Sequence, residues 1–195
     1  MGTLTSLQVV PGSEGITVGQ AKRVKALAIF AGNPTPIQFS PVTWSSNYTS
    51  VATIDATGKA TCLAGGRATL SATDPSSGIT STATGGNCVL SCLVPQLVQI
   101  FPRPSSSSTA LTGTVGTTTQ LRARVTYVGG QTQGVNAVVH WSSSDDAIVT
   151  VSNGSDGNKA GFTTFVSPGM ATITITYPAT PASPALTDSV LFQVK

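Results

Sequence analysis

Charge is scarce in this chain and is nowhere concentrated. Only 9% of the 195 residues are charged, and the net charge of +3 comes from ten scattered basic residues against seven acidic ones. Without a dense Lys/Arg cluster there is no electrostatic footprint for nucleic acid. No apolar run approaches the roughly 18 residues that a membrane helix requires. We therefore expect neither nucleic acid nor direct membrane insertion among the interactions.

Groups that carry catalysis are equally sparse. The single histidine, His140, stands beside Trp141 in an expected strand and has no companion base or ligand. The carboxylates lie at or near turns, where Asp bonds its own backbone. Asp145, Asp146 and Asp156 are the one set that could meet to bind calcium, but their spacing matches no calcium loop. We predict a protein that is not an enzyme, with no cofactor and no metal.

Low charge has a second consequence, for the surface. The mean hydropathy is +0.20, high for a chain without a membrane segment. With so little charge to keep the outer faces wet, we expect some apolar surface to lie against other protein. The N-terminus shows no basic segment followed by an apolar one, so we expect no signal peptide in this chain. We expect either a piece of a longer secreted protein or a chain that reaches its place by binding.

The chain repeats itself. Residues 42–46 (VTWSS) return 97 positions later (139 − 42) as residues 139–143 (VHWSS). Residues 66–70 (GRATL) return as residues 169–173 (GMATI), now displaced by 103 (169 − 66), so the second copy carries insertions. Each copy is just under one hundred residues, a length at which a sheet sandwich closes a core of its own.

Short runs of apolar residues alternating with Ser and Thr, broken by Gly, Pro and Asn, dominate both copies. This pattern is typical of antiparallel strands with one wet face, and about eight strands per copy predict a β-sandwich. In the first copy we place the last strand at residues 79–84. We divide the chain into a first domain at residues 1–87, a short stiff connector at 88–95 and a second domain at 96–195.

The first copy resembles a known family. Besides the VTWSS strand it carries residues 50–55 (SVATID), residues 57–60 (TGKA) and Gly66 before residues 68–72 (ATLSA). Together these motifs resemble the group-2 bacterial immunoglobulin-like domain, with residues 98–194 as a divergent second member. The resemblance implies an all-β chain of two tandem immunoglobulin-like antiparallel β-sandwiches. Such domains occur on bacterial surface adhesins, as accessories of secreted enzymes and on phage particles, and the resemblance implies no active site.

Two repeated tryptophans are the expected core residues. Trp44 and Trp141 lie mid-strand with apolar neighbours at even spacing, where a large ring fills the space between two sheets. We predict that both are structural rather than ligand-stacking residues.

Two outward strips form a candidate docking surface. Alternation in residues 23–30 turns Val24 and Ala26 inward and leaves Lys25, Leu27 and Ile29 outward. The second copy repeats the outward pattern at Arg122 and Arg124. These basic, partly apolar strips are either a docking surface or a solvated sheet face.

Three cysteines occur, at positions 62, 88 and 92. Cys62 is expected to be a free, buried thiol. Cys88 and Cys92 lie in the expected connector, and a bond between them requires a turn, because four extended residues span about 13 Å and a disulfide tolerates roughly 7 Å between α-carbons. The odd count also allows a bond to another chain.

Two functions remain open. The first is a structural decoration subunit of a phage virion, on the capsid or tail, whose partners are other virion subunits. The alternative is a two-domain fragment of a secreted bacterial adhesin, with a host-surface ligand bound by loops such as residues 103–108 and 178–184. Both place the chain outside the cell, on a virion or in a surface assembly.

Overall fold

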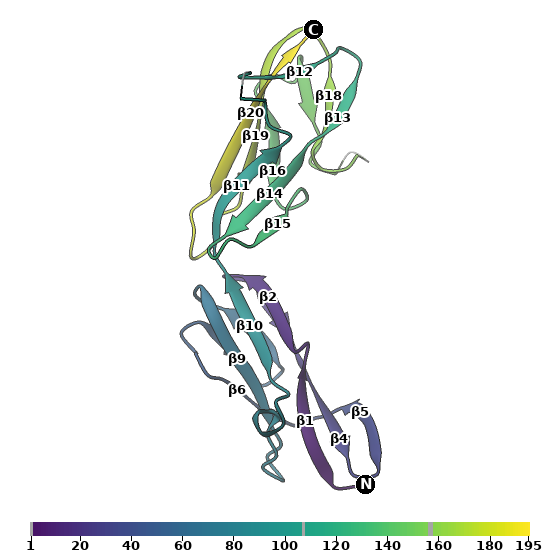
Figure 1. Cartoon of the computed structure of the whole chain (residues 1–195), viewed down its shortest axis with the longest axis vertical. Coiled ribbons are helices and arrows are strands. Elements are labelled where there is room, and N and C mark those ends of the chain that lie inside the picture. Colours follow the sequence, from purple (N-terminus) through teal and green to yellow (C-terminus); the bar gives the residue numbers. More distant parts are fainter. Residues whose placement is uncertain (1, 107, 156–157) are drawn as a thin grey trace. The chain divides into compact units, whose positions relative to one another are not determined.

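The computed structural model describes residues 2–106, 108–155 and 158–195. The chain divides into two compact units, Met1–Val94 (unit 1) and Pro95–Lys195 (unit 2). Figure 1 shows the strands of each unit.

Unit 1 is built almost entirely from strands. Its described residues include one 3-10 helix, η1 (Ser81–Thr84), which is capped by the Thr80 side chain. Among the described residues there is no helix with the length and apolar character needed to cross a membrane. The strands are β1 (Leu4–Val10), β2 (Ser13–Thr17), β3 (Ala21–Arg23), β4 (Lys25–Phe30), β5 (Asn33–Gln38), β6 (Thr43–Ser46), β7 (Ala52–Ile54), β8 (Lys59–Cys62), β9 (Gly66–Thr73) and β10 (Cys88–Leu93).

The strands of unit 1 form one larger and two smaller sheets. The larger sheet has the order β2-β10-β9-β6, and the smaller ones the orders β1-β4-β5 and β3-β8-β7. β2 runs parallel to β10, whereas every other pairing in the unit is antiparallel. Val24 alone separates β3 from β4 and so links the two smaller sheets. Buried residues of β9 and β10 meet those of β4, β7 and β8, which places the core between the larger sheet and the smaller pair.

Unit 2 repeats this architecture strand for strand. Its sheets have the orders β12-β20-β19-β16, β11-β14-β15 and β13-β18-β17, and β12 again runs parallel to β20. The chain is therefore all-β, with two sandwiches in tandem. The strands are β11 (Pro95–Phe101), β12 (Leu111–Gly113), β13 (Thr118–Gln120), β14 (Arg122–Tyr127), β15 (Thr132–Gly134), β16 (His140–Ser143), β17 (Val149–Val151), β18 (Phe162–Phe165), β19 (Gly169–Tyr177) and β20 (Leu186–Val194).

Two expectations at the end of unit 1 are corrected. Residues 81–84 form η1 instead of the last strand. The expected connector at residues 88–95 does not exist as such, because residues 88–93 are β10, hydrogen-bonded between β2 and β9. The physical reason is burial: Cys88, Leu90 and Cys92 alternate inward and supply the centre of the larger sheet.

The alternation expected in the two long central strands is present in both units. Ala26 and Ala28 of β4 are buried, and so are Ala123, Val125 and Tyr127 of β14. β5, which pairs with β4, is exposed at all six residues. Pro34 and Pro36 remove two N–H donors from this strand, which limits its use as a template for further strand pairing.

The two cores are filled with different side chains. In unit 1 the fully buried hydrophobic residues are Ala, Val, Leu and Cys, without an aromatic ring. In unit 2 the core holds five aromatic residues: Tyr127, Trp141, Phe165, Tyr177 and Phe192. The same strand order thus encloses two cores of different composition.

Candidate functional site

Unit 1 has a pocket beside its tryptophan. The pocket has a volume of about 250 Å³, and Trp44 of β6 forms one of its walls. Arg23 and Lys25 line it from β3 and β4, and the remaining lining residues are Val24, Ala26, Gln38, Phe39, Ser40, Pro41, Val42, Ala56 and Thr57. Trp44 is only half-buried and packs against the edge of the core. It departs in this from the fully buried role expected for it.

In unit 2 the corresponding tryptophan is enclosed. Trp141 is 1% exposed, and its indole Nε1 donates a hydrogen bond to the Asn136 carbonyl oxygen at 3.0 Å. The amide of Asn153 clamps the backbone of Trp141, accepting from its N–H at 2.7 Å and donating to its carbonyl at 2.9 Å. Together these bonds satisfy the indole N–H and the backbone N–H and carbonyl of the buried Trp141.

Asn136 fills the place that is open in unit 1. Its Nδ2 donates to the carbonyl oxygens of Leu121 (2.8 Å) and Ala160 (3.0 Å), and its Oδ1 accepts from the N–H of Ala123 (2.9 Å). A wider surface recess of about 620 Å³ lies over Asn136, but Trp141 does not line it. The side chain of Asn136 thus separates the tryptophan from the surface.

The register of the two units shows that Ser40 stands where Asn136 does. Phe39 N–H donates to the Ala26 carbonyl, as Val135 N–H donates to the Ala123 carbonyl. The next residue in each chain is Ser40 and Asn136, respectively. A hydroxymethyl group in place of a carboxamide leaves the pocket of unit 1 unfilled.

A glycine packs on each indole ring. Gly58 has φ +78°, and an added Cβ would lie 2.6 Å from the Val24 carbonyl oxygen and 3.2 Å from the Trp44 ring. Gly161 has φ +85° and meets Leu121 and Trp141 in the same way. Only glycine satisfies both the left-handed turn and the close approach.

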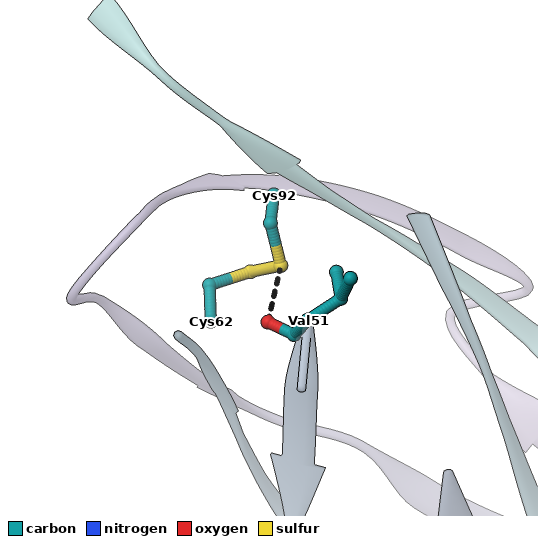
Figure 2. The surroundings of a disulfide bond; sticks show 3 residues. All are labelled: Val51, Cys62 and Cys92. Carbon is teal, nitrogen blue, oxygen red and sulfur yellow. Dashed lines mark hydrogen bonds between the residues drawn. A yellow bond between two sulfur atoms is a disulfide. The ribbon is translucent and has the colours of Figure 1, made fainter. Parts of the chain in front are cut away.

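The disulfide of unit 1 joins Cys62 to Cys92, with their α-carbons 5.5 Å apart (Figure 2). The expected Cys88–Cys92 bond is wrong, because both residues lie on β10 four positions apart on an extended strand. Cys62 is therefore not a free thiol, and Cys88 is. Burial raises the pKa of the Cys88 thiol. The Val51 carbonyl oxygen lies 3.7 Å from Cys92 Sγ (Figure 2), a contact and not a hydrogen bond, since a disulfide sulfur carries no hydrogen.

Aromatic packing replaces the disulfide in unit 2. Cys62 and Cys92 correspond in register to Phe165 of β18 and Val194 of β20. The Phe165 ring packs against Phe192 with 5.3 Å between centroids. Gly113 of β12 makes room for it, because an added Cβ would lie 2.6 Å from the Phe165 ring.

The candidate docking strips occupy the outward side of β4 and β14. Lys25, Arg122 and Arg124 are exposed, whereas Leu27 and Ile29 are half-buried instead of exposed as expected. The Arg124 guanidinium lies 5.2 Å from the centre of the Phe101 ring, a cation–π contact within unit 2. Lys25 contributes to the pocket beside Trp44. The docking role of these strips remains a proposal.

The candidate catalytic and metal-binding residues are dispersed. His140 is exposed on β16, opposite Thr176. Asp145 caps its own turn by accepting from the N–H of Ala147 at 2.9 Å. Asp156 lies outside the described residues. Within the described part of the chain, no three His, Cys, Asp or Glu residues are grouped to hold a metal ion.

The inserted loop that begins at Arg103 is fastened to unit 2. Arg103 forms an ion pair with Asp188 of β20, and the same carboxylate accepts from the Ile100 N–H at 2.7 Å. Arg103 Nη1 also donates to the Ser189 carbonyl at 3.3 Å. The start of this loop is therefore held by β20. In the 178–184 loop, Thr180 and Ser183 form an isolated β-bridge.

Two features of the site were not predicted from the sequence. Asn136 lies outside the repeated VHWSS segment. The residues on either side of it in the sequence do not distinguish a buried amide from a turn residue. Cys62 was separated from its partner by 30 residues, a spacing that carries no distance information.

The two units share an architecture of paired sheets around one core, which defines them as immunoglobulin-like β-sandwiches. Residues 3–84 match the family described as bacterial Ig-like domain (group 2). The match falls within unit 1.

One curated relative spans both units. Ice-binding protein 1 from Shewanella frigidimarina (strain NCIMB 400) is 31% identical over 159 residues, which is 81% of this chain. The chain spans only 17% of the length of that relative.

Solved structures to which the chain is similar include domains 4 and 5 of the S-layer protein SbsC, at 16% identity and a TM-score of 0.42, with 99% of each chain covered. A C-terminal 282-residue fragment of intimin, solved with the intimin-binding domain of its translocated receptor, has 15% identity and a TM-score of 0.31. That comparison covers 97% of this chain and 64% of the fragment.

Proposed function

We propose that this chain is a two-domain segment of a longer bacterial surface protein, in which it serves as a non-catalytic spacer and protein-binding module. One observation carries the proposal. The 159-residue match to the Shewanella frigidimarina protein is longer than either unit, since unit 1 has 94 residues and unit 2 has 101 (195 − 94). The match therefore extends over both units in tandem, within a protein of which they make up a small part.

The chemistry of unit 1 agrees with an extracellular destination. A Cys62–Cys92 disulfide persists in oxidising compartments and is rare in the cytosol. The low charge and the Ser/Thr-rich outer faces agree with a spacer. Such faces are hydrated, but their electrostatic potential is too weak to attract charged ligands.

The non-catalytic role rests on the dispersal of reactive groups. No described histidine or cysteine stands with a second group in the geometry of a nucleophile and its base, since His140 is exposed and Cys88 is buried in the core. The surface-protein interpretation is preferred to the virion subunit because the relative is a bacterial protein much longer than this chain.

Immunodetection in the source bacterium distinguishes the two interpretations. An antibody raised against the chain is expected to label intact cells or their secreted fraction, on a polypeptide far larger than 19.7 kDa. Protease added to intact cells should remove that signal, whereas a cytoplasmic protein probed in parallel should survive. Detection of a 19.7 kDa chain in purified phage particles would replace the proposal with the virion interpretation.

A further inference from the structure

The backbone of Trp44 directs two polar groups away from the larger sheet of unit 1. One residue beyond β6, the Asn47 N–H donates to the Thr69 carbonyl of β9. Hydrogen-bonded positions alternate along an antiparallel pair, so Trp44 and its partner Ala72 form a non-hydrogen-bonded pair. The Ala72 N–H agrees with this register, because it donates to the Ser81 hydroxyl and not to β6. The N–H and C=O of Trp44 therefore lie on the outer edge of the sheet.

In unit 2 a carboxamide occupies the same edge. The Ser144 N–H donates to the Thr172 carbonyl, which gives β16 and β19 the register of β6 and β9. The two outward backbone groups of Trp141 are bonded by one side chain, that of Asn153. Its Oδ1 accepts from the N–H at 2.7 Å, and its Nδ2 donates to the C=O at 2.9 Å. A primary carboxamide is thus complementary to both backbone groups at once.

Unit 1 lacks this side chain. The glycine that packs on each indole ring donates its N–H to the carbonyl of a turn residue, Asp55 in unit 1 and Ser152 in unit 2. The next residue along the chain is Ala56 in unit 1 and Asn153 in unit 2. Ala56 lines the pocket, and its methyl group neither donates nor accepts a hydrogen bond. No described residue bonds the N–H or C=O of Trp44 in its place.

A second carboxamide of unit 2 is also missing from this pocket. In unit 2 Asn136 accepts from the Ala123 N–H and donates to the Leu121 carbonyl. The corresponding residues of unit 1 are Ala26 and Val24, which both line the pocket and are 2% exposed. Buried backbone groups in folded proteins are normally paired. The pocket is therefore lined by backbone groups for which unit 2 supplies carboxamide partners and unit 1 does not.

These backbone groups select a neutral ligand group over a carboxylate. Arg23 Nη1 donates to the Thr57 carbonyl at 3.1 Å, as Gln120 Nε2 donates to the Ala160 carbonyl at 3.0 Å, so Arg23 takes over a structural contact of unit 2. The outward edge of Trp44 presents one donor and one acceptor. A carboxylate accepts only, and would place an oxygen against the carbonyl oxygen without a hydrogen between them. A primary carboxamide has the oxygen and the N–H side by side that the edge requires.

We propose that the pocket beside Trp44 binds a primary carboxamide, the group that ends an Asn or Gln side chain. Its oxygen accepts from the Trp44 N–H, and its nitrogen donates to the Trp44 carbonyl. The pocket volume of about 250 Å³ is below the roughly 300–1,000 Å³ of ordinary small-molecule sites, which limits the ligand to one such group. The inference goes beyond the spacer role, because it concerns unit 1 wherever the chain resides.

The backbone amide signals of the full chain provide the test. In a ¹H–¹⁵N correlation spectrum, titration with acetamide is expected to move the Trp44 backbone signal saturably. The Trp141 backbone signal is the internal control and should stay in place, because Asn153 already bonds that N–H. Absence of a saturable movement at Trp44, or equal movement at Trp141, would overturn the proposal.

Matched ligands test the chemistry. N-methylacetamide carries a methyl group in place of the N–H beside the oxygen, and acetate has no donor. Both are expected to bind roughly tenfold more weakly than acetamide, or weaker still, because the Trp44 carbonyl is left without a hydrogen bond. Equal binding of the three ligands would overturn the proposal.

A peptide ligand identifies the source of the group. N-acetyl-Gly-Asn-Gly-N-methylamide carries its one primary carboxamide on the Asn side chain. Tighter binding of this peptide than of acetamide supports a polypeptide as the source, whereas tighter binding of acetamide supports a small free amide. Both results uphold a carboxamide site. Binding of the matched Asp peptide as tight as that of the Asn peptide would overturn it.

Two variants test the residues. Ala56→Asn supplies the side chain that bonds the equivalent backbone in unit 2, and is expected to abolish the response of Trp44 to acetamide. Thr53→Asn places the same side chain at an exposed position of β7 outside the pocket lining, and should leave the response unchanged. An undiminished response in Ala56→Asn would overturn the proposal. Should that variant fail to fold, the ligand series on the unaltered chain still decides.

Discussion

The two units carry the same strand order but fill their cores by different means. Unit 1 packs small aliphatic residues and cysteine, and adds a covalent bond between β8 and β10. Unit 2 contains no cysteine, and Phe165, packed against Phe192, stands at the position of Cys62. The outer topology is thus compatible with two interiors of different composition, as long as the total volume between the sheets is conserved.

The difference extends to the tryptophans. Trp141 is enclosed, and its indole N–H is satisfied by Asn136. Trp44 is half-buried and borders a pocket. The comparison teaches that a repeated residue can be enclosed in the core of one copy while it borders an open pocket in the other.

The largest effect is expected from emptying the enclosed tryptophan site. Trp141→Ala should destabilise unit 2 by roughly 3–5 kcal/mol, because it removes a buried ring and leaves a cavity. Trp44→Ala should cost unit 1 less, on the order of 2 kcal/mol, since part of that ring already contacts solvent. Residue-resolved amide hydrogen exchange of the full chain measures both losses. Equal losses in the two variants would contradict the difference in burial.

The disulfide comes next in size. Reduction, or the double change Cys62→Ser and Cys92→Ser, should destabilise unit 1 by about 3–4 kcal/mol, as expected for a cross-link closing a 30-residue loop. Unit 2 has no cysteine and should be unaffected. Thermal unfolding with and without reductant, followed by signals from each unit, provides the comparison. Reductant should still shift unit 1 in Cys88→Ala, because Cys88 is outside the bond.

A smaller effect is expected where unit 2 makes room for its aromatic pair. Gly113→Ala places a Cβ 2.6 Å from the Phe165 ring and should destabilise unit 2 by roughly 1–3 kcal/mol through overpacking. Gly134→Ala in the same unit meets nothing within 4 Å and is the matched control. If chemical denaturation gave the two variants the same stability, the packing argument for Phe165 would fail.

The smallest effect concerns acid. Hydrogen bonds from the hydroxyls and backbone of Ser77 and Ser76 lower the pKa of Asp74 from 3.8 to about 2. A depressed pKa means that the ionised form stabilises the folded state above pH 3.8, and that this stabilisation is lost as the pH falls toward 2. Unit 1 should therefore lose stability in this window. Asp74→Asn should flatten that part of the pH profile, and an unchanged acid limb would refute the role of Asp74.

Much of the fold was predictable from the sequence because it rests on local alternation. The period-two pattern of β4 and β14 is visible in the residues themselves, and the VTWSS and VHWSS segments locate the same strand in each unit. β10 was misread because Gly85, Gly86 and Pro95 frame it as a linker, while its burial depends on β2 and β9, which are distant in the chain.

The candidate site was less accessible to sequence reasoning. The pairing of Cys62 with Cys92 depends on β8 and β10 facing each other across the core, a long-range relation that spacing does not encode. The neighbouring pair Cys88 and Cys92 seemed the simpler choice only while residues 88–95 were taken as a loop. The pocket beside Trp44 is left open because Ser40 has a smaller side chain than Asn136, its counterpart in unit 2. This correspondence is apparent only when the two units are compared in register.

The parallel pairing of β2 with β10 determines how unit 1 responds to tension. Five residue pairs, from Ser13–Val89 to Thr17–Leu93, join a strand near the start of the unit to the strand at its end. A pull that enters through β2 and leaves through β10 runs along both strands, so it shears all five pairs together instead of opening them one at a time. In unit 2 the corresponding β12–β20 ladder has three pairs. Under load, unit 2 is therefore expected to extend first and unit 1 to act as the stronger link.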